Sequence, residues 1–266
     1  MVDVVCHGLT FTGVEAIFFD KDGTLEDSRL FLGKLARRRV EAIVTIVPEM
    51  EEIAANLLLT FGIGGREAPC QSQDHAVPWQ SQDLSLDPQG LMAVGSYQEN
   101  KMAAAAYIAS RGYSWWESQE LAEQAFQQAG RQIVPDLDTA PLFPGCLEVI
   151  KSLHDSGLKL GIISADSIQG ITSFVDRENL GDYFQLLLGS DRDLSKPDPL
   201  LYLKACKLLD VDPQNTLMIG DAIGDITMAK QAHAQGTIGI TWDEPQSKHL
   251  SLASLTIDNL AVVRAI

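Results

Sequence analysis

The sequence predicts an α/β fold, a doubly wound parallel sheet into which an all-helical domain is inserted. Two observations lead to this prediction. After Pro141, short apolar runs alternate with stretches of helical periodicity, which is typical of a parallel sheet covered by helices. In the long stretch between the first strand and Pro141, apolar residues recur at helical spacing instead. We therefore expect an α/β core domain at residues 1–27 and 140–266, and a helical domain at residues 28–139.

The core domain is expected to contain one hairpin, five strands and five helices. Residues 2–11 alternate loosely and break at His7-Gly8, which predicts the small hairpin beside the sheet. Short apolar runs predict the strands at 16–19, 158–163, 185–188, 216–219 and 237–240. Helical periodicity with start and stop signals predicts the helices at 146–154, 167–179, 199–209, 224–234 and 258–265.

The inserted domain is expected to consist of helices and one long loop. Apolar spacing predicts helices at 30–46, 49–61, 97–109 and 115–129. Ser114 and Glu117 have the spacing of a capping box at the start of the last of these. Residues 66–90 contain three prolines and few aliphatic residues. They predict a loop of a length that is usually functional or disordered.

The charge of the chain indicates which kinds of partner to expect. The net charge is −16, and Lys and Arg form no run beyond Arg37–Arg39. We expect no nucleic-acid partner, because such binding needs a sustained basic surface. An acidic protein weakly repels anions at long range, so a phosphorylated small molecule would have to be captured by local charge. The sequence leaves open whether the protein is a monomer or a homodimer.

Cysteine spacing and hydropathy indicate the cellular location of the protein. Cys6, Cys70, Cys146 and Cys206 lie far apart without a C-x-x-C pair, so we expect neither a zinc site nor a disulfide framework. No run approaches the roughly 20 apolar residues of a membrane span. The first residues lack the basic and apolar regions of a signal peptide. We expect a cytoplasmic protein that does not associate with membranes.

Two aspartates follow the first buried strand and mark the expected site. Asp20 and Asp22 come directly after the apolar run 16–19, and Gly23 and Thr24 follow them. A charged pair at the end of a buried strand is unfavourable unless something compensates it. Open α/β sheets bind ligands just beyond the carboxyl ends of their strands. Such a pair suits Mg²⁺, which prefers oxygen ligands, while one carboxylate acts as a nucleophile.

A second polar segment follows the strand expected at 158–163. Ser164 lies at the same sheet edge as Asp20, where its hydroxyl can donate a hydrogen bond to a phosphoryl oxygen. Taken alone, Ser164 would be interpreted as a helix cap or a turn residue. Ala165 and Asp166 follow it. An acid near a phosphate would weaken anion binding or bind a cationic group of the substrate.

Two further segments carry charge near the expected helices. Lys196 stands at the start of the helix at 199–209, where a cation is unfavourable for the helix dipole, so a partner elsewhere is expected. Asp221 and Asp225 follow the strand at 216–219. They fit metal binding, and Asp225 also fits partial capping of the next helix.

Together these segments resemble the motifs of the haloacid dehalogenase-like (HAD) hydrolases. Their patterns are D-x-D-G-T at 20–24, a strand-end serine at 164, K-P-x-P at 196–199 and G-D-x-x-x-D at 220–225. The residue after this serine is often Asn in the family, so Ala165 followed by Asp166 departs from the family pattern. The resemblance covers residues 14–27 and 140–260, and the pattern is similar to that of phosphoglycolate-phosphatase-type enzymes. It implies a Rossmann-like core with a helical C1-type cap inserted after the first motif.

The resemblance also implies roles for individual residues. Asp20 would attack phosphorus to give an aspartyl-phosphate, and Asp22 would serve as acid and then base. The implied catalytic residues are Asp20, Asp22, Ser164 and Lys196. The implied substrate-binding residues are Thr24, Ser164, Ala165 and Lys196. Mg²⁺ is the implied cofactor, with Asp20, Asp221 and the backbone carbonyl of Asp22 as its ligands and Asp225 in support behind them.

The implied function is hydrolysis of a small phosphorylated metabolite, phosphoglycolate or a sugar phosphate. Three alternatives stay open. Asp22 counts against a haloacid dehalogenase, because halide displacement needs no acid at that position. A phosphomutase would use the same core residues and differ in how it excludes water. The complete set of motif residues counts against a non-catalytic ligand-binding protein on this scaffold.

Overall fold

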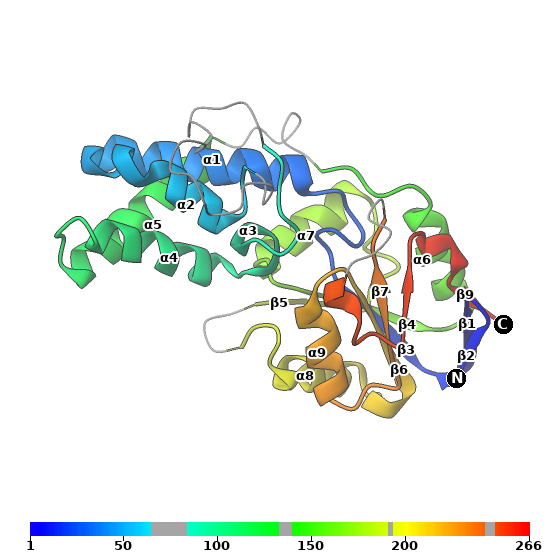
Figure 1. The fold of residues 1–266 in the computed structure, drawn as a ribbon. Coiled ribbons are helices and arrows are strands. Elements are labelled where there is room, and N and C mark those ends of the chain that lie inside the picture. The colour runs from blue at the N-terminus through cyan, green and yellow to red at the C-terminus, as the bar shows by residue number, and fades with distance from the viewer. Residues whose placement is uncertain (65–83, 133–139, 191–193, 243–247) are drawn as a thin grey trace. The chain divides into compact units, whose positions relative to one another are not determined.

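The computed structural model describes residues 1–64, 84–132, 140–190, 194–242 and 248–266. The chain forms two compact units, and the first combines Met1–Asp27 with Pro141–Ile266 (Figure 1). The second unit is Ser28–Ala140. Most of the loop expected at 66–90 lies outside the described residues.

The first unit is built on a six-stranded parallel sheet with β3 at its middle. The spatial order is β5-β4-β3-β6-β7-β8. The strands are β3 Ala16–Phe19, β4 Lys159–Ser164, β5 Leu186–Gly189, β6 Thr216–Gly220, β7 Gly236–Ile240 and β8 Leu255–Ile257. Phe19 pairs with Ile162 on one side and with Ile219 on the other. β4 and β6 extend two residues and one residue past the level of Phe19, so the three central strands end close to one another.

Helices cover both faces of this sheet. Successive side chains of a strand point to opposite faces, and accordingly Ile17 and Phe19 join one apolar cluster while Ala16 and Phe18 join another. Helices α6 and α7 pack into the first cluster, and α8 and α9 pack into the second. Their bounds are α6 Cys146–Asp155, α7 Ile168–Arg177, α8 Pro199–Leu209 and α9 Ile223–Gln231. The predicted doubly wound α/β fold is confirmed.

A small antiparallel sheet contains both ends of the chain. The expected hairpin is present as β1 (Val2–Cys6) and β2 (Leu9–Val14), and its turn places His7 at φ 47° and Gly8 at φ 81°. The third strand, β9 (Arg264–Ala265), pairs with β1.

The helix expected at 258–265 was therefore a wrong prediction. Residues 255–257 form the edge strand β8, and the chain then makes only one 3₁₀ turn, Leu260–Val262, before β9. Leu260 and Val263 are both buried. Their spacing of three residues resembles the apolar face of an α-helix, but here it arises from a single 3₁₀ turn. The Asn259 side chain accepts a hydrogen bond from Ala261 N and starts that turn. The following Val263 has extended backbone angles, as its branched side chain favours.

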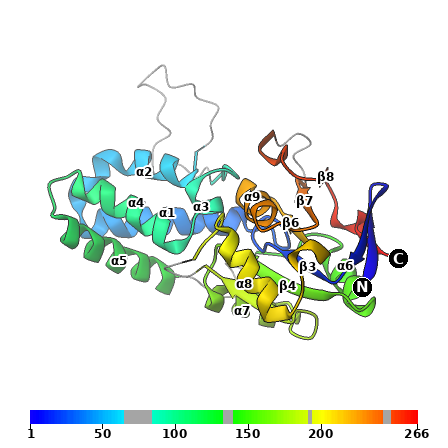
Figure 2. The same ribbon diagram turned by 90° about the horizontal axis from the view of Figure 1, so that it is seen from below.

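The regular elements described in the second unit are all helices, and one isolated antiparallel bridge joins Ile63 to Leu86. Its elements are α1 Arg29–Ile46, η1 Pro48–Ile53, α2 Ala54–Phe61, α3 Leu91–Val94, α4 Tyr97–Ala109 and α5 Trp115–Arg131. Figure 2 shows the long helices α1, α4 and α5 running alongside one another. The helix expected at 49–61 begins as the 3₁₀ turn η1, because Ile53, at φ −118°, interrupts the α-helical path. Buried alanines of α4 and α5 let the helices approach closely.

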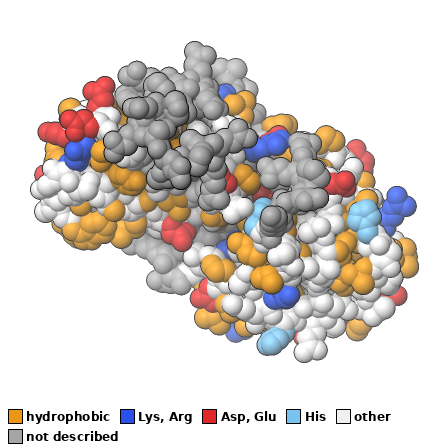
Figure 3. Space-filling view, viewed as in Figure 1, with side chains coloured by type: hydrophobic (Ala, Val, Ile, Leu, Met, Phe, Trp, Pro, Cys, Tyr) orange, Lys and Arg blue, Asp and Glu red, His pale blue; other side chains and the backbone are white. Residues whose placement is uncertain are grey.

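Figure 3 shows how charged side chains are distributed on one face of the molecule. On the face drawn in Figure 3, the described Lys and Arg side chains stand apart from one another rather than forming a continuous basic area. Within the described ranges, no helix combines the length and the apolar character that a membrane span requires.

Candidate active site

The candidate site lies where the three central strands of the parallel sheet end. Asp20 follows β3, Ser164 is the last residue of β4, and Asp221 follows β6. The chain leaves β3 for β4 and β5 on one side and later crosses to β6, β7 and β8 on the other. This change of direction is the position at which open α/β sheets bind ligands.

A tight turn arranges the two aspartates after β3. The backbone carbonyl of Lys21 accepts hydrogen bonds from Leu25 N at 2.9 Å and from Glu26 N at 3.1 Å. Gly23 has φ 76°, a conformation that residues with a side chain rarely adopt. A Cβ atom at Gly23 would overlap the Asp221 carboxylate. A glycine is therefore required here both by the backbone and by the closeness of the neighbouring loop.

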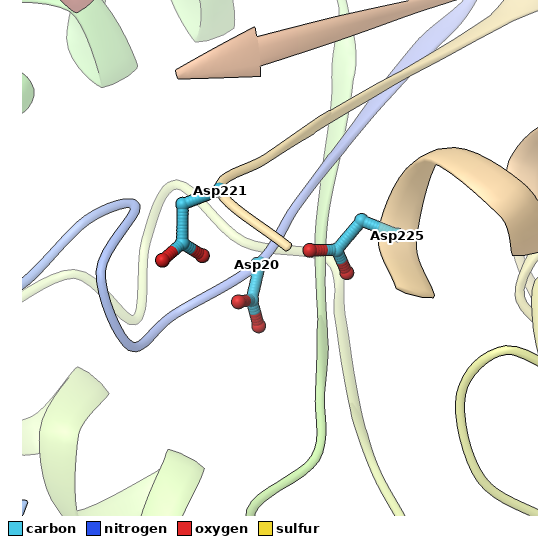
Figure 4. Close-up of side chains that lie close together, drawn as sticks. All are labelled: Asp20, Asp221 and Asp225. Carbon is cyan, nitrogen blue, oxygen red and sulfur yellow. The ribbon is translucent and has the colours of Figure 1, made fainter. Parts of the chain in front are cut away.

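Three carboxylates converge beside this turn. One oxygen from each of Asp20, Asp221 and Asp225 lies within 4.8 Å of the others (Figure 4). Loss of water contact, together with the charges of Asp20 and Asp225, raises the pKa of Asp221 well above its ordinary value. A cation among these carboxylates would relieve their repulsion, and oxygen donors of this kind suit Mg²⁺. The residues present therefore fit a divalent cation.

The three carboxylates are not equivalent. Asp225 is fully buried; it pairs with Lys196 through one oxygen and accepts a hydrogen bond from Ala222 N through the other. Both of its oxygens thus have partners within the protein. Asp221 is half-buried and accepts a hydrogen bond from the Thr24 hydroxyl at 3.3 Å. This arrangement fits Asp20 and Asp221 as ligands, with Asp225 behind them.

Lys196 supplies the positive charge at the centre of the cluster. Its Nζ lies 2.7 Å from Asp20 Oδ1 and 2.6 Å from Asp225 Oδ1, and only 6% of its side chain is exposed. Burial opposes the charge, but Asp20 and Asp225 outweigh burial and raise the pKa of Lys196. Asp198 caps α8 by accepting from Leu200 N. Lys196 is therefore an inward-facing cation and not the surface start of a helix.

Ser164 lies in the same region as an almost fully buried hydroxyl. It is 1% exposed, and its Oγ accepts a hydrogen bond from Asp166 N at 3.1 Å. The cap of α7 is Ser167, whose side chain accepts from Gly170 N. The alternative interpretation of Ser164 as the helix cap is thus excluded. Ala165 follows Ser164 in the same loop and is half-buried.

A second charged cluster surrounds the lysine between the two aspartates. Lys21 Nζ lies 2.8 Å from Asp22 Oδ2, 2.7 Å from Glu26 Oε1 and 3.4 Å from Asp166 Oδ2. Glu26 also pairs with Arg177 of α7 at 2.6 Å. Burial would lower the pKa of Lys21, but the three carboxylates raise it. Lys21 is therefore a charged group within the unit.

Comparison with known proteins assigns the family. The sequence model of the haloacid dehalogenase-like hydrolase family matches residues 14–233 of this chain. The chain belongs to this family. It is 27% identical over 143 residues to a phosphoglycolate phosphatase of Pseudomonas putida, covering 53% of this chain and 52% of that protein. The chain spans about half the length of the curated relatives it matches.

Solved structures of HAD proteins share the fold. A predicted phosphoglycolate phosphatase from Haemophilus somnus matches with a TM-score of 0.61 at 17% identity, covering 94% of this chain and 96% of that one. A β-phosphoglucomutase from Clostridium difficile matches with a TM-score of 0.58 at 19% identity, covering 93% and 92%. At sequence identities this low, these matches show that the fold is shared and do not show a shared activity.

The structure brings the predicted HAD motif residues to one sheet edge. Their roles stay predictions, and one of them has an unexpected partner. Thr24, expected to bind substrate, is fully buried and donates to Asp221. In this structure its hydroxyl orients a carboxylate.

Four residues of this region were not among the site residues predicted from the sequence. Lys21, Glu26 and Arg177 form the second charged cluster, and His249 Nε2 lies 3.1 Å from the backbone carbonyl of Asp221. The position of Lys21 between two aspartates was a usable signal. Arg177 and His249 lie outside the motif segments, so only the folded chain reveals their contacts.

Proposed function

We propose that this protein is a Mg²⁺-dependent phosphomonoester hydrolase that works through an aspartyl-phosphate on Asp20. The observation that carries the proposal is the position of the Asp20 carboxylate. It lies at the central strand end, 2.7 Å from the Lys196 ammonium and beside the carboxylate of Asp221. The named phosphatases among the relatives support the reaction class.

The proposed reaction has two steps. In the first, a carboxylate oxygen of Asp20 bonds to phosphorus as the bond to the leaving oxygen breaks, and Asp22 gives that oxygen a proton. In the second, Asp22 takes a proton from a water molecule whose oxygen attacks phosphorus. The bond between phosphorus and Asp20 then breaks, which releases inorganic phosphate and restores the Asp20 carboxylate.

The remaining site residues stabilise charge. Lys196 and Ser164 would hold the phosphoryl oxygens, with the backbone around Ala165 nearby. Mg²⁺, held by Asp20, Asp221 and the backbone carbonyl of Asp22, would neutralise negative charge on the phosphoryl group. Asp225 would keep Lys196 in place. The Thr24 hydroxyl would act mainly by orienting Asp221.

We infer that the substrate is a small phosphorylated metabolite, with phosphoglycolate and sugar phosphates as the first candidates. The names of the curated relatives support phosphoglycolate. We further propose that the helical unit Ser28–Ala140 is a cap domain that selects the substrate. Its insertion directly after the first motif supports this assignment.

A screen of phosphorylated metabolites tests the proposal. Phosphate release is measured with the purified protein, with Mg²⁺ and with EDTA, and with Asp20→Asn as the matched control. We expect release that needs both the metal and Asp20. Release by Asp20→Asn at the wild-type rate would refute the nucleophile. Transfer of the phosphoryl group to a second sugar hydroxyl without phosphate release would indicate a mutase instead.

A further inference from the structure

Lys21 has an environment that the proposed reaction does not by itself explain. Its side chain is 5% exposed, and its Nζ lies within 3.4 Å of the carboxylates of Asp22, Glu26 and Asp166. A lysine is rarely buried unless its charge is paired. Removing its ammonium group would leave several carboxylates close together in a poorly hydrated place. The group is therefore a fixed part of the turn that carries Asp20 and Asp22.

The two oxygens of Asp22 have different surroundings. Oδ2 lies 2.8 Å from Lys21 Nζ. Oδ1 is buried, and among the residues that the structure describes it has no hydrogen-bond partner. One oxygen is thus held, while the other has no partner among the described residues. This division suits a carboxylate that exchanges a proton with a bound substrate, because one oxygen fixes its orientation while the other can bond to the reacting group.

We propose that Lys21 is a positioning residue that fixes the Asp22 carboxylate, while Glu26 and Asp166 in turn fix Lys21. This inference rests on the proposed function, in which Asp22 is the acid and base. Lys21 does not itself contact the substrate, because its ammonium is enclosed by these carboxylates and its side chain is almost fully buried. The same geometry gives Asp166 a role. Its Oδ2 faces Lys21 and its Oδ1 accepts from Ser167 N.

Glu26 extends this arrangement to helix α7. Its Oε1 lies 2.7 Å from Lys21 Nζ, and its Oε2 lies 2.6 Å from Arg177 Nη2. Glu26 is 3% exposed, so both of its oxygens are paired inside the unit. The nucleophile turn, the loop after β4 and the end of α7 are therefore joined through Lys21. A displacement of the Lys21 ammonium group would therefore change the orientation of the Asp22 carboxylate, which it contacts directly.

The dependence of rate on the leaving group tests this role. Lys21→Met is compared with wild type on phosphoglycolate, whose alcohol needs a proton to depart, and on 4-nitrophenyl phosphate, whose phenolate does not. We expect kcat/KM to fall at least about tenfold for phosphoglycolate and less than about threefold for 4-nitrophenyl phosphate. Lys207→Met, an exposed lysine of α8, is the matched control and should leave both values unchanged. Equal losses on the two esters would overturn the inference, because general damage to the fold does not discriminate between leaving groups.

Two further measurements cover the remaining outcomes. Lys21→Gln keeps an N–H donor in the same place and should give a selectivity between those of wild type and Lys21→Met. If Lys21→Met does not fold, unchanged selectivity in Lys21→Gln overturns the inference. If wild type hydrolyses neither of these esters, the alkyl phosphate that it hydrolyses best in the metabolite screen takes the place of phosphoglycolate, and the proposed function fails separately if no ester in that screen is hydrolysed. Crystal structures of the variants then decide this inference: a turned Asp22 carboxylate supports it, and an unchanged one overturns it.

Discussion

Replacing Lys196 by methionine should destabilise the protein strongly and in a pH-dependent way. The ammonium group pairs with Asp20 at 2.7 Å and with Asp225 at 2.6 Å, and the lysine side chain is 6% exposed. Removing one partner of a buried ion pair lowers the free energy of unfolding by about 3–5 kcal/mol. Here the change leaves two carboxylates unpaired and close to Asp221, so we expect the upper part of that range near neutral pH.

The same geometry predicts the direction of the pH effect. Without the ammonium group, the buried carboxylates have higher pKa values in the folded than in the unfolded protein. A raised pKa means that the folded state holds its proton more tightly, so stability is lost as the pH rises. The destabilisation by Lys196→Met should therefore be larger at pH 8 than at pH 5. Added Mg²⁺ should recover part of it, because a cation can replace the lost charge.

Urea unfolding followed by tryptophan fluorescence measures this effect. Wild type, Lys196→Met and the exposed control Lys207→Met are compared at both pH values, with EDTA and with Mg²⁺. The control should stay within about 0.5 kcal/mol of wild type, as surface substitutions usually do. A loss in Lys196→Met no larger than that of the control would refute the reasoning, because the paired lysine would then contribute nothing.

Three further predictions concern single positions. Asp20→Asn should lower kcat by more than about 10⁴-fold, as loss of a nucleophile does elsewhere; residual turnover near the wild-type rate would contradict it. Gly23→Ala should destabilise the protein by at least about 1 kcal/mol, because the φ of 76° is unfavourable for a residue with a side chain. It should also weaken Mg²⁺ binding measured by calorimetry, because the new Cβ would overlap the Asp221 carboxylate. An unchanged affinity for Mg²⁺ would disprove this steric explanation. In EDTA, wild-type stability should fall as the pH rises from about 4 to about 7, because burial raises the pKa of the Asp225 carboxyl from 3.8 to about 7. Asp225→Asn should show a smaller fall, and equal slopes in urea titrations would show that another group is responsible.

The strand and helix pattern of the core was predictable because local signals agree there. The apolar run Ala16–Phe19 is buried on both faces of the sheet, so it indicates a strand without reference to partners. The C-terminal segment was mispredicted because Leu260 and Val263 are buried at a spacing that one 3₁₀ turn also produces. Pairing of β9 with β1 joins residues from opposite ends of the chain, and sequence spacing does not reveal such a partner.

The candidate site also has features that the sequence predicts and others that it does not. Asp20, Ser164 and Asp221 each follow or end an apolar run, so the sequence alone is enough to place them at one sheet edge. The burial of Lys196 between two carboxylates and the orientation of Thr24 toward Asp221 depend on tertiary packing. Local sequence patterns carry no information about such contacts.

Chemical trapping of the intermediate tests the central claim most directly. Wild-type protein is mixed with phosphoglycolate and Mg²⁺, quenched in acid within a single turnover, digested, and analysed by mass spectrometry. If phosphoglycolate is not turned over, the ester that the protein hydrolyses best is used in its place. We expect one phosphoryl group on Asp20, absent when Asp20→Asn is used. A phosphoryl group on another residue, or phosphate release with no phosphorylated peptide at any quench time, would contradict the proposed mechanism.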